Sequence, residues 1–78
     1  MRADRVLDVR GLSCPWSCLK TLSIIRLLKP GQVLDVLCTD ALTVKDLTCI
    51  LEQTENHLLG VEKQPDFFRL HVLRGPKR

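Results

Sequence analysis

Aromatic residues are scarce in this chain of 78 residues, which has one tryptophan, two phenylalanines and no tyrosine. Proteins that bind single-stranded nucleic acid usually stack the bases on several aromatic side chains within a strongly basic groove. The formal net charge of +3 is modest by that standard. We therefore expect no direct binding of nucleic acid.

Long apolar runs are lacking as well. No stretch approaches the roughly 18 to 20 apolar residues that span a bilayer, and the charged start of the chain leads into an alternating segment rather than the apolar core of a signal peptide. We expect a cytoplasmic protein without membrane association. Because thiols are kept reduced in the cytoplasm, structural disulfides are not expected among Cys14, Cys18, Cys38 and Cys49.

The chain is short enough to limit its chemistry. We expect a single domain over residues 1–78, and a domain of this size buries only about 60% of its unfolded surface. Little room remains for a deep cavity with several catalytic groups. The sequence therefore favours one reactive side chain at the surface, completed by a partner protein, in a molecule that we expect to be monomeric.

The spacing of apolar residues predicts six elements. They are a strand over 5–10, a helix from 15 to about 29, a strand over 33–38, a helix from 43 to about 56, and strands over 59–63 and 67–74. Thr43 and Asp46 suggest a capping box at the second helix. The order βαβαββ predicts a mixed four-stranded sheet with both helices on one face, a two-layer α/β sandwich of the α+β class.

One segment has the features of a reactive site: Gly11-Leu12-Ser13-Cys14-Pro15-Trp16-Ser17-Cys18. Proline is favoured at the first position of a helix, so Cys14 is expected to be the N-cap. Its sulfur could then accept hydrogen bonds from the free amides of Trp16 and Ser17 at the positive end of the helix dipole. Such positions depress the pKa of cysteine, which would favour a thiolate or a persulfide anion.

The chain resembles the TusA/SirA family of small sulfur-carrier proteins in several motifs. They are Gly11-Leu12-x-Cys14-Pro15 with Asp8 three residues before the glycine, Lys29-Pro30-Gly31 after the first helix, and Thr39-Asp40-x-x-Thr43-x-x-Asp46. The resemblance covers residues 7–74. It implies a fold like the C-terminal domain of bacterial translation initiation factor three, with strand order 1-2-4-3 and the fourth strand antiparallel to the others.

The resemblance also implies an activity. The family's persulfide-bearing cysteine corresponds to Cys14, and its following proline corresponds to Pro15, which begins the helix and positions the thiol. Sulfur would come from a cysteine desulfurase or a rhodanese-type donor and go to an acceptor protein in tRNA thiolation, molybdenum-cofactor maturation or sulfur oxidation. The protein would then be a sulfurtransferase-type carrier, without a cofactor, rather than a stand-alone enzyme.

Three positions depart from the family pattern. Ser17 replaces the second proline of Cys-Pro-x-Pro, and Thr39-Asp40-Ala41 replaces Asp-Asp-Pro. Cys18 adds a second thiol that the family does not require. Because positions four apart share a helix face, Cys18 could resolve a persulfide on Cys14 by forming a disulfide, or it could simply pack into the core.

Partner contacts are expected around the thiol, from Trp16, Ser17, Arg10 and Lys20. Tryptophan is enriched in interface hot spots, although Trp16 could instead fold over the helix start. Asp40 is expected near Cys14, shaping the turn into the second helix.

Three other functions remain open. A metal-binding module would use Cys14, Cys18 and His57 or His71, but only one ligand pair has suitable spacing, so we expect no metal site. A regulatory or RNA-binding domain finds no support in charge or aromatics. A thiol–disulfide redox switch of Cys14 and Cys18 is the nearest competitor.

Overall fold

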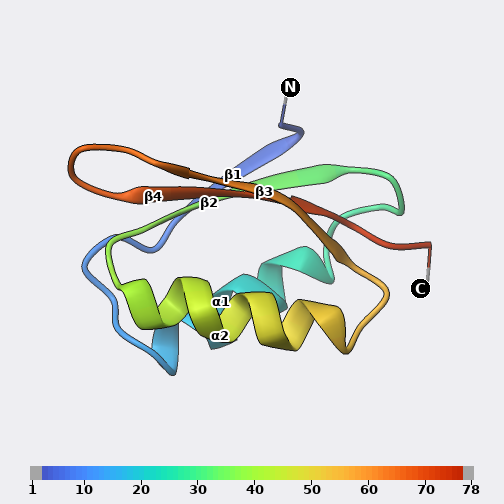
Figure 1. Cartoon of the computed structure of the whole chain (residues 1–78). Coiled ribbons are helices and arrows are strands. Elements are labelled where there is room, and N and C mark those ends of the chain that lie inside the picture. The colour runs from blue at the N-terminus through green and yellow to red at the C-terminus, as the bar shows by residue number, and fades with distance from the viewer. Residues whose placement is uncertain (1–2, 77–78) are drawn as a thin grey trace.

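The computed structural model describes residues 3–76 and confirms the predicted order of elements (Figure 1). The strands and helices are β1 (Arg5–Asp8), α1 (Trp16–Ile25), β2 (Val33–Cys38), α2 (Ala41–Glu52), β3 (His57–Lys63) and β4 (Phe68–Leu73). No helix in this part of the chain is long and apolar enough to cross a membrane.

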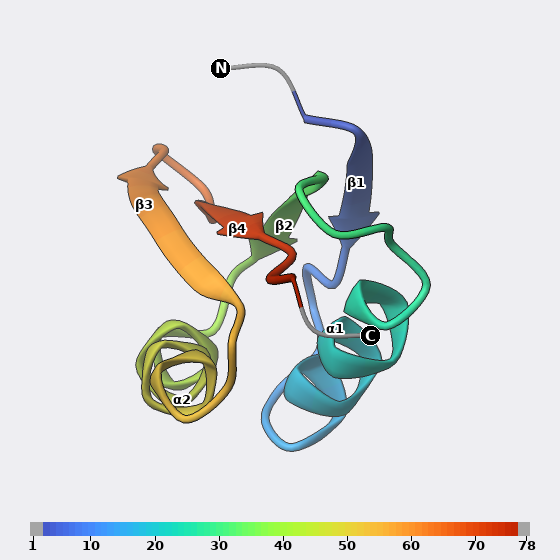
Figure 2. The same ribbon diagram turned by 90° about the vertical axis from the view of Figure 1, so that its right-hand side faces the viewer.

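The four strands form one mixed sheet in the order β1-β2-β4-β3. β1 and β2 run parallel, and β4 is antiparallel to both β2 and β3, as the family resemblance implies. Both helices lie under the same face of the sheet, with α1 below β1 and α2 below β3 when the molecule is viewed along the helices (Figure 2). The predicted two-layer α+β sandwich is confirmed.

The core lies between the sheet and the two helices. Alternate residues of a strand point to opposite faces, and in β2 the side chains of Leu34, Val36 and Cys38 are fully buried on the helix side. Leu47 of α2 and Ile25 of α1 meet them from below. The parallel strands β1 and β2 both end at one edge of this core, where the loops to the helices begin.

The apolar spacing of the first predicted helix indicates a buried stripe of Cys18, Leu19, Leu22, Ile25 and Leu28, and all of these but Leu19 are buried or half-buried. α1 is shorter than predicted. It ends at Ile25, because the next turns tighten: the amides of Leu27 and Leu28 bond to carbonyls only three residues back. The predicted stripe included Leu19, which is 53% exposed. Polar Ser17 and Thr21 are buried instead, and their hydroxyls find hydrogen-bond partners inside the protein, as burial of polar groups requires.

α2 begins two residues before the predicted start. Asp40 is its N-cap, and the Oδ1 atom of this side chain accepts a hydrogen bond of 3.1 Å from the amide of Leu42. Thr43 is therefore inside the first turn and not a cap. The predicted capping box of Thr43 and Asp46 is wrong, which leaves the Asp46 carboxylate available for another partner.

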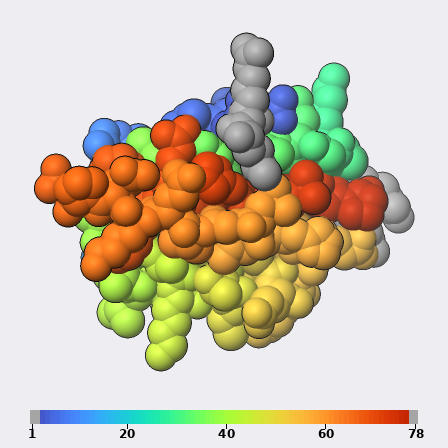
Figure 3. All heavy atoms as spheres, turned by 45° about the horizontal axis from the view of Figure 1, so that its top comes forward, coloured from blue at the N-terminus to red at the C-terminus, as the bar shows by residue number. Residues whose placement is uncertain are grey.

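The sheet face without helices carries a polar cluster. Asp35 of β2 is only 1% exposed there, because Arg69 and His71 of the neighbouring strand β4 close over it, with hydrogen bonds of 2.8 and 2.7 Å to its two carboxylate oxygens. Figure 3 looks obliquely onto this side, with β3 and β4 in orange to red and α2 in yellow-green below them. The cluster ties the two central strands together.

Candidate functional site

The loop from β1 to α1 holds Cys14 and is anchored by the loop after β2. Gly11 has a φ of 87°, in the left-handed region that glycine enters without strain, and its amide donates to the Thr39 hydroxyl at 3.0 Å. The amide of Cys14 donates to Asp40 Oδ2 at 3.2 Å. These two hydrogen bonds hold the loop that contains Cys14 against the start of α2. They confirm the expected position of Asp40 near Cys14.

The start of α1 differs from the prediction. Pro15 is the N-cap and provides no side-chain hydrogen bond, and the Cys14–Pro15 peptide bond is cis. The amide of Ser17, expected to point at the Cys14 sulfur, donates to the carbonyl of Ser13 at 3.2 Å. Cys14 therefore lies one residue before the cap, and the prediction that it caps the helix with its sulfur is wrong.

The partner of the Cys14 thiol is Asp46 of α2. The Cys14 Sγ donates to Asp46 Oδ2 at 2.9 Å. This bond stabilises the protonated thiol, and it raises the pKa of Cys14 to about 12, with further contributions from the neighbouring Cys18 sulfur and from burial. The sequence predicted a lowered pKa from helix amides. The structure gives the opposite direction, because an ionised sulfur here would face a carboxylate.

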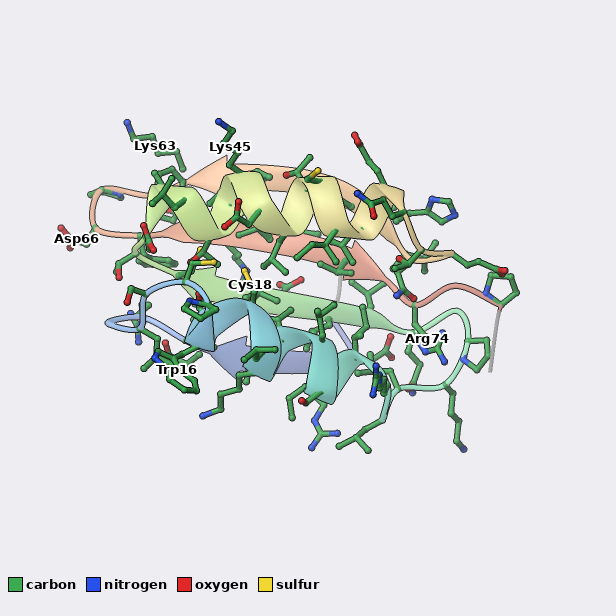
Figure 4. The ribbon with its side chains drawn as sticks, turned by 90° about the horizontal axis from the view of Figure 1, so that it is seen from below. Trp16, Cys18, Lys45, Lys63, Asp66 and Arg74 are labelled. Carbon is green, nitrogen blue, oxygen red and sulfur yellow. The ribbon has the colours of Figure 1, made fainter. Side chains whose placement is uncertain are left out.

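Cys18 lies beside Cys14, and its side chain points into the space between the two helices (Figure 4). It is 4% exposed and belongs to the core, in agreement with the prediction that Cys18 packs there. Its Sγ nevertheless lies 3.6 Å from the Sγ of Cys14. Cys14 itself is half-buried, so one residue of the pair is partly exposed and the other is closed off.

The remaining cysteines lie in other environments. Cys38 is fully buried in β2, and burial raises its pKa to about 11, which suits an inert side chain of the core. Cys49 is exposed on α2, where the side chain of Gln53 lies 3.9 Å from its sulfur.

Of the residues predicted to contact a partner, Trp16 is exposed and Ser17 is buried. Trp16 is 66% exposed and points away from α2 (Figure 4). Ser17 is fully buried, and its hydroxyl lies 2.6 Å from that of Thr43. Ser17 therefore cannot contact a partner at the surface. Its role is to join the two helices directly beneath the thiol.

The two predicted basic contacts lie around Asp8. Arg10 forms an ion pair of 2.8 Å with Asp8 and stacks 5.2 Å from the centre of the Phe67 ring. Both side chains of the pair are about half exposed. The hydrogen bonds from Arg10 lower the pKa of Asp8 to about 2, and the exposed Lys20 contributes a smaller effect. The positive charge of Arg10 is thus largely matched by Asp8.

Asp46 is the residue that sequence reasoning missed. It is half-buried and lies between buried Thr43 and buried Leu47 on α2. An acidic residue that flanks the apolar stripe of a helix is the signal that could have identified it, because such a side chain is held against the layer that covers the stripe. The sequence pattern predicts a helix cap for it instead.

The ligand set weighed for a metal-binding module is only partly brought together. Cys14, Cys18 and Asp46 have ligand atoms within 4.8 Å of one another, but neither histidine joins them. His71 contacts Asp35 on the opposite face of the sheet, and His57 is exposed at the start of β3. Three groups are one fewer than a closed structural zinc site uses.

A hollow among the described residues lies away from the thiol. Its volume is about 370 Å³, and it is open to solvent at the C-terminal end of α2. The residues that line it are Thr48, Leu51, Glu52, Thr54, Asn56, His57 and Leu58. No predicted site residue is among them. The Cys14 thiol is therefore not part of this hollow.

Comparison with known proteins matches the chain to one family. The family model described as "Sulfurtransferase TusA" covers residues 5–74. The sulfur carrier protein TusA of Allochromatium vinosum is 36% identical over 72 residues, which are 92% of this chain and 95% of that protein. The putative sulfur carrier protein YrkI of Bacillus subtilis is 32% identical and is covered over its whole length.

Other relatives are longer. The putative sulfur carrier protein YrkF of Bacillus subtilis is 38% identical, but this chain spans only 40% of its length. Among solved structures, a SirA-like protein from Desulfitobacterium hafniense superposes with a TM-score of 0.71 at 20% identity, covering 91% of this chain and 97% of that one. At this identity the superposition establishes the fold alone.

Proposed function

Because this chain belongs to the TusA sulfurtransferase family, we propose that it is a sulfur carrier whose Cys14 accepts a sulfur atom as a persulfide and passes it to another protein. The observation that carries the proposal is the placement of Cys14. Its thiol is partly open at the end of the parallel strands and bonded at 2.9 Å to a carboxylate that can take its proton.

The loading step follows from this pair. A donor enzyme presents a cysteine persulfide, and the Cys14 sulfur attacks the outer sulfur atom of that persulfide. The new sulfur–sulfur bond forms on Cys14, the donor's own sulfur–sulfur bond breaks, and the donor cysteine leaves as a thiolate. Asp46 accepts the Cys14 proton and returns it to the leaving thiolate, so no net oxidation or reduction occurs.

A high thiol pKa has a use in a carrier. The thiolate is the reactive form of cysteine, and the hydrogen bond to Asp46 keeps unloaded Cys14 protonated at neutral pH. Random electrophiles and oxidants therefore meet a poor nucleophile. Within the complex, a docked donor would hold its persulfide against the Cys14 sulfur while Asp46 takes the thiol proton, so the thiol would be activated only there.

Docking is proposed to involve the exposed apolar side chains that surround the thiol. Trp16 is 66% exposed and Leu12 is 37% exposed, and both come from the segment that holds Cys14. Lys20 lies on α1, as Trp16 does. Tryptophan contributes strongly to binding when a partner buries it, so Trp16 is the proposed anchor. Arg10, already paired with Asp8, would contribute at the rim.

The donor is proposed to be a cysteine desulfurase or a rhodanese-like protein, and the acceptor a protein of tRNA thiolation, molybdenum-cofactor maturation or sulfur oxidation. We propose that the carrier acts as a monomer in the cytoplasm, where thiols stay reduced, over a single domain, without direct contact to nucleic acid. Its chemistry requires no cofactor, since the partners supply and remove the sulfur.

Loading from a desulfurase with isotopically labelled cysteine tests the proposal. Cys14→Ser should abolish transfer of labelled sulfur, whereas Cys49→Ser, which removes an exposed thiol on α2, should leave it unchanged. Trp16→Ala should slow transfer, while Leu27→Ala, equally exposed two residues beyond the end of α1, should not. Full labelling of the Cys14→Ser protein would refute the carrier role.

A thiol–disulfide switch is the second candidate, supported by the 3.6 Å between the sulfurs of Cys14 and Cys18. Such a switch needs both thiols, while loading needs Cys14 alone. Cys18→Ser therefore separates the two functions: it should abolish a redox switch and leave sulfur loading intact.

A further inference from the structure

Cys18 is not needed for loading, yet its sulfur is one of the two nearest neighbours of the Cys14 sulfur. The two Sγ atoms are 3.6 Å apart, and a disulfide holds its sulfurs about 2.0 Å apart. The third member, Asp46, has a carboxylate oxygen no more than 4.8 Å from either sulfur.

The geometry points to a second activity of this cluster: in the absence of an acceptor, Cys18 discharges the sulfur carried on Cys14 as sulfide. This activity rests on the proposed persulfide at Cys14. The carrier would thus hold its sulfur for a limited time and then release it in a harmless reduced form.

The step balances without any other reactant. The Cys18 sulfur attacks the inner sulfur of the persulfide, which is Sγ of Cys14, and a bond forms between the two Sγ atoms. The bond from Cys14 Sγ to the carried sulfur breaks, and that sulfur leaves with the electron pair as hydrosulfide. The carried sulfur gains two electrons, and the two cysteines lose two in becoming a disulfide.

Asp46 couples this step to loading. In the unloaded protein its carboxylate accepts the Cys14 hydrogen at 2.9 Å. Loading replaces that hydrogen by sulfur, so Asp46 loses its donor. Cys18 is then the remaining thiol of the cluster, and Asp46 becomes free to accept its proton. The same carboxylate therefore serves Cys14 before loading and Cys18 after it.

Burial makes the reaction specific. Cys18 is 4% exposed between the helices, so an external persulfide or disulfide cannot reach it. Cys14 is the neighbour that its sulfur does reach. An acceptor docked over Cys14 competes for the same sulfur from the open side, and a productive transfer leaves Cys18 unused. Afterwards, a small thiol or a dithiol reductant would restore a discharged carrier by reducing the disulfide.

Loading with inorganic polysulfide, followed by desalting without oxygen, tests the inference without a donor enzyme. Intact mass and released sulfide are then followed over time. The wild type and Cys49→Ser should lose the added sulfur, release one sulfide per chain and end two hydrogen atoms lighter than the reduced protein. Peptide mapping should locate the disulfide at Cys14–Cys18. Cys18→Ser should keep the added sulfur, and Asp46→Asn should discharge at least about 10-fold more slowly, as expected on loss of a general base.

The outcomes separate this inference from the carrier role. A wild type that gains sulfur on Cys14 and keeps it as long as Cys18→Ser does would overturn the discharge activity and leave the carrier role intact. A wild type that gains no sulfur on Cys14 would refute the carrier role itself. Cys18→Ala replaces Cys18→Ser if a buried serine prevents folding, and the mapped disulfide in the wild type tests the step without any variant.

Discussion

Replacing Asp46 by asparagine should make Cys14 more reactive toward a small electrophile in the free protein, where no donor is docked and Asp46 holds the thiol in its protonated form. In the unloaded protein, Asp46 accepts the thiol hydrogen and raises the pKa of Cys14 to about 12 from an ordinary 9.0. Asparagine keeps the size and a carbonyl oxygen but removes the negative charge. The pKa of Cys14 should therefore fall.

The size of the effect follows from the pKa change. At neutral pH a lower pKa increases the thiolate fraction tenfold per unit, but each unit also reduces intrinsic nucleophilicity, with a Brønsted coefficient of about 0.45. If Asp46 accounts for the whole shift, alkylation of Cys14 should accelerate about 45-fold, and if it accounts for half, about 7-fold. In the second case the neighbouring Cys18 sulfur and burial account for the other half of the pKa shift.

The assay is the rate of Cys14 alkylation by iodoacetamide as a function of pH, read from the mass of the Cys14 peptide in a Cys49→Ser background. The wild-type rate should keep rising into the most alkaline range, and the variant should level off at lower pH. Asp66→Asn, an exposed carboxylate in the turn between β3 and β4 (Figure 4), is the matched control. An unchanged or slower rate in Asp46→Asn would refute the assignment of the thiol's protonation to Asp46.

Three further predictions concern the fold around the site. Ser17→Ala should lower the free energy of unfolding by about 1 to 2 kcal/mol, because it leaves the buried Thr43 hydroxyl without its 2.6 Å partner; urea denaturation should show a smaller loss for Ser23→Ala, whose hydroxyl is exposed, and equal losses would contradict the buried pair. Asp35→Ala should lower the free energy of unfolding by about 2 to 4 kcal/mol, less than for a wholly buried pair because Arg69 is 37% exposed. Glu62→Ala, which removes an exposed neighbour of His71, should lower it by less than about 1 kcal/mol. A larger loss for Glu62→Ala than for Asp35→Ala would show that the cluster does not depend on the buried carboxylate. The Asp8 carboxyl should titrate by NMR near pH 2 in the wild type and closer to 3.8 in Arg10→Gln; titration of the wild type at the ordinary value would show that the ion pair does not persist in solution.

Local patterns were sufficient for the architecture. Strand alternation and helix periodicity are properties of neighbouring residues, and they predicted the order βαβαββ and both helices on one face. They also located Cys14 at the start of a helix, since Pro15 marks that boundary. The end of α1 was missed because Leu27 and Leu28 continue an apolar spacing while their amides already form tighter turns.

The environment of the thiol could not be predicted in this way. Its main contact joins Cys14 to a residue 32 positions later, and that contact depends on the path of the loop before α1. In the sequence, the spacing of Thr43 and Asp46 fits a capping box. The position of Asp46 beside Leu47 fits the edge of a buried helix face equally well. The helix start at Asp40, seen only in the structure, decides between them and reverses the direction of the Cys14 pKa shift.

The account depends most on the identity of the sulfur-bearing atom. Fragmentation mass spectrometry of the wild type, immediately after loading by a desulfurase and blocking of free thiols, should find one extra sulfur on the peptide at Cys14 and none at Cys38 or Cys49. Extra sulfur on another cysteine, with Cys14 carrying only the blocking group, would contradict the account.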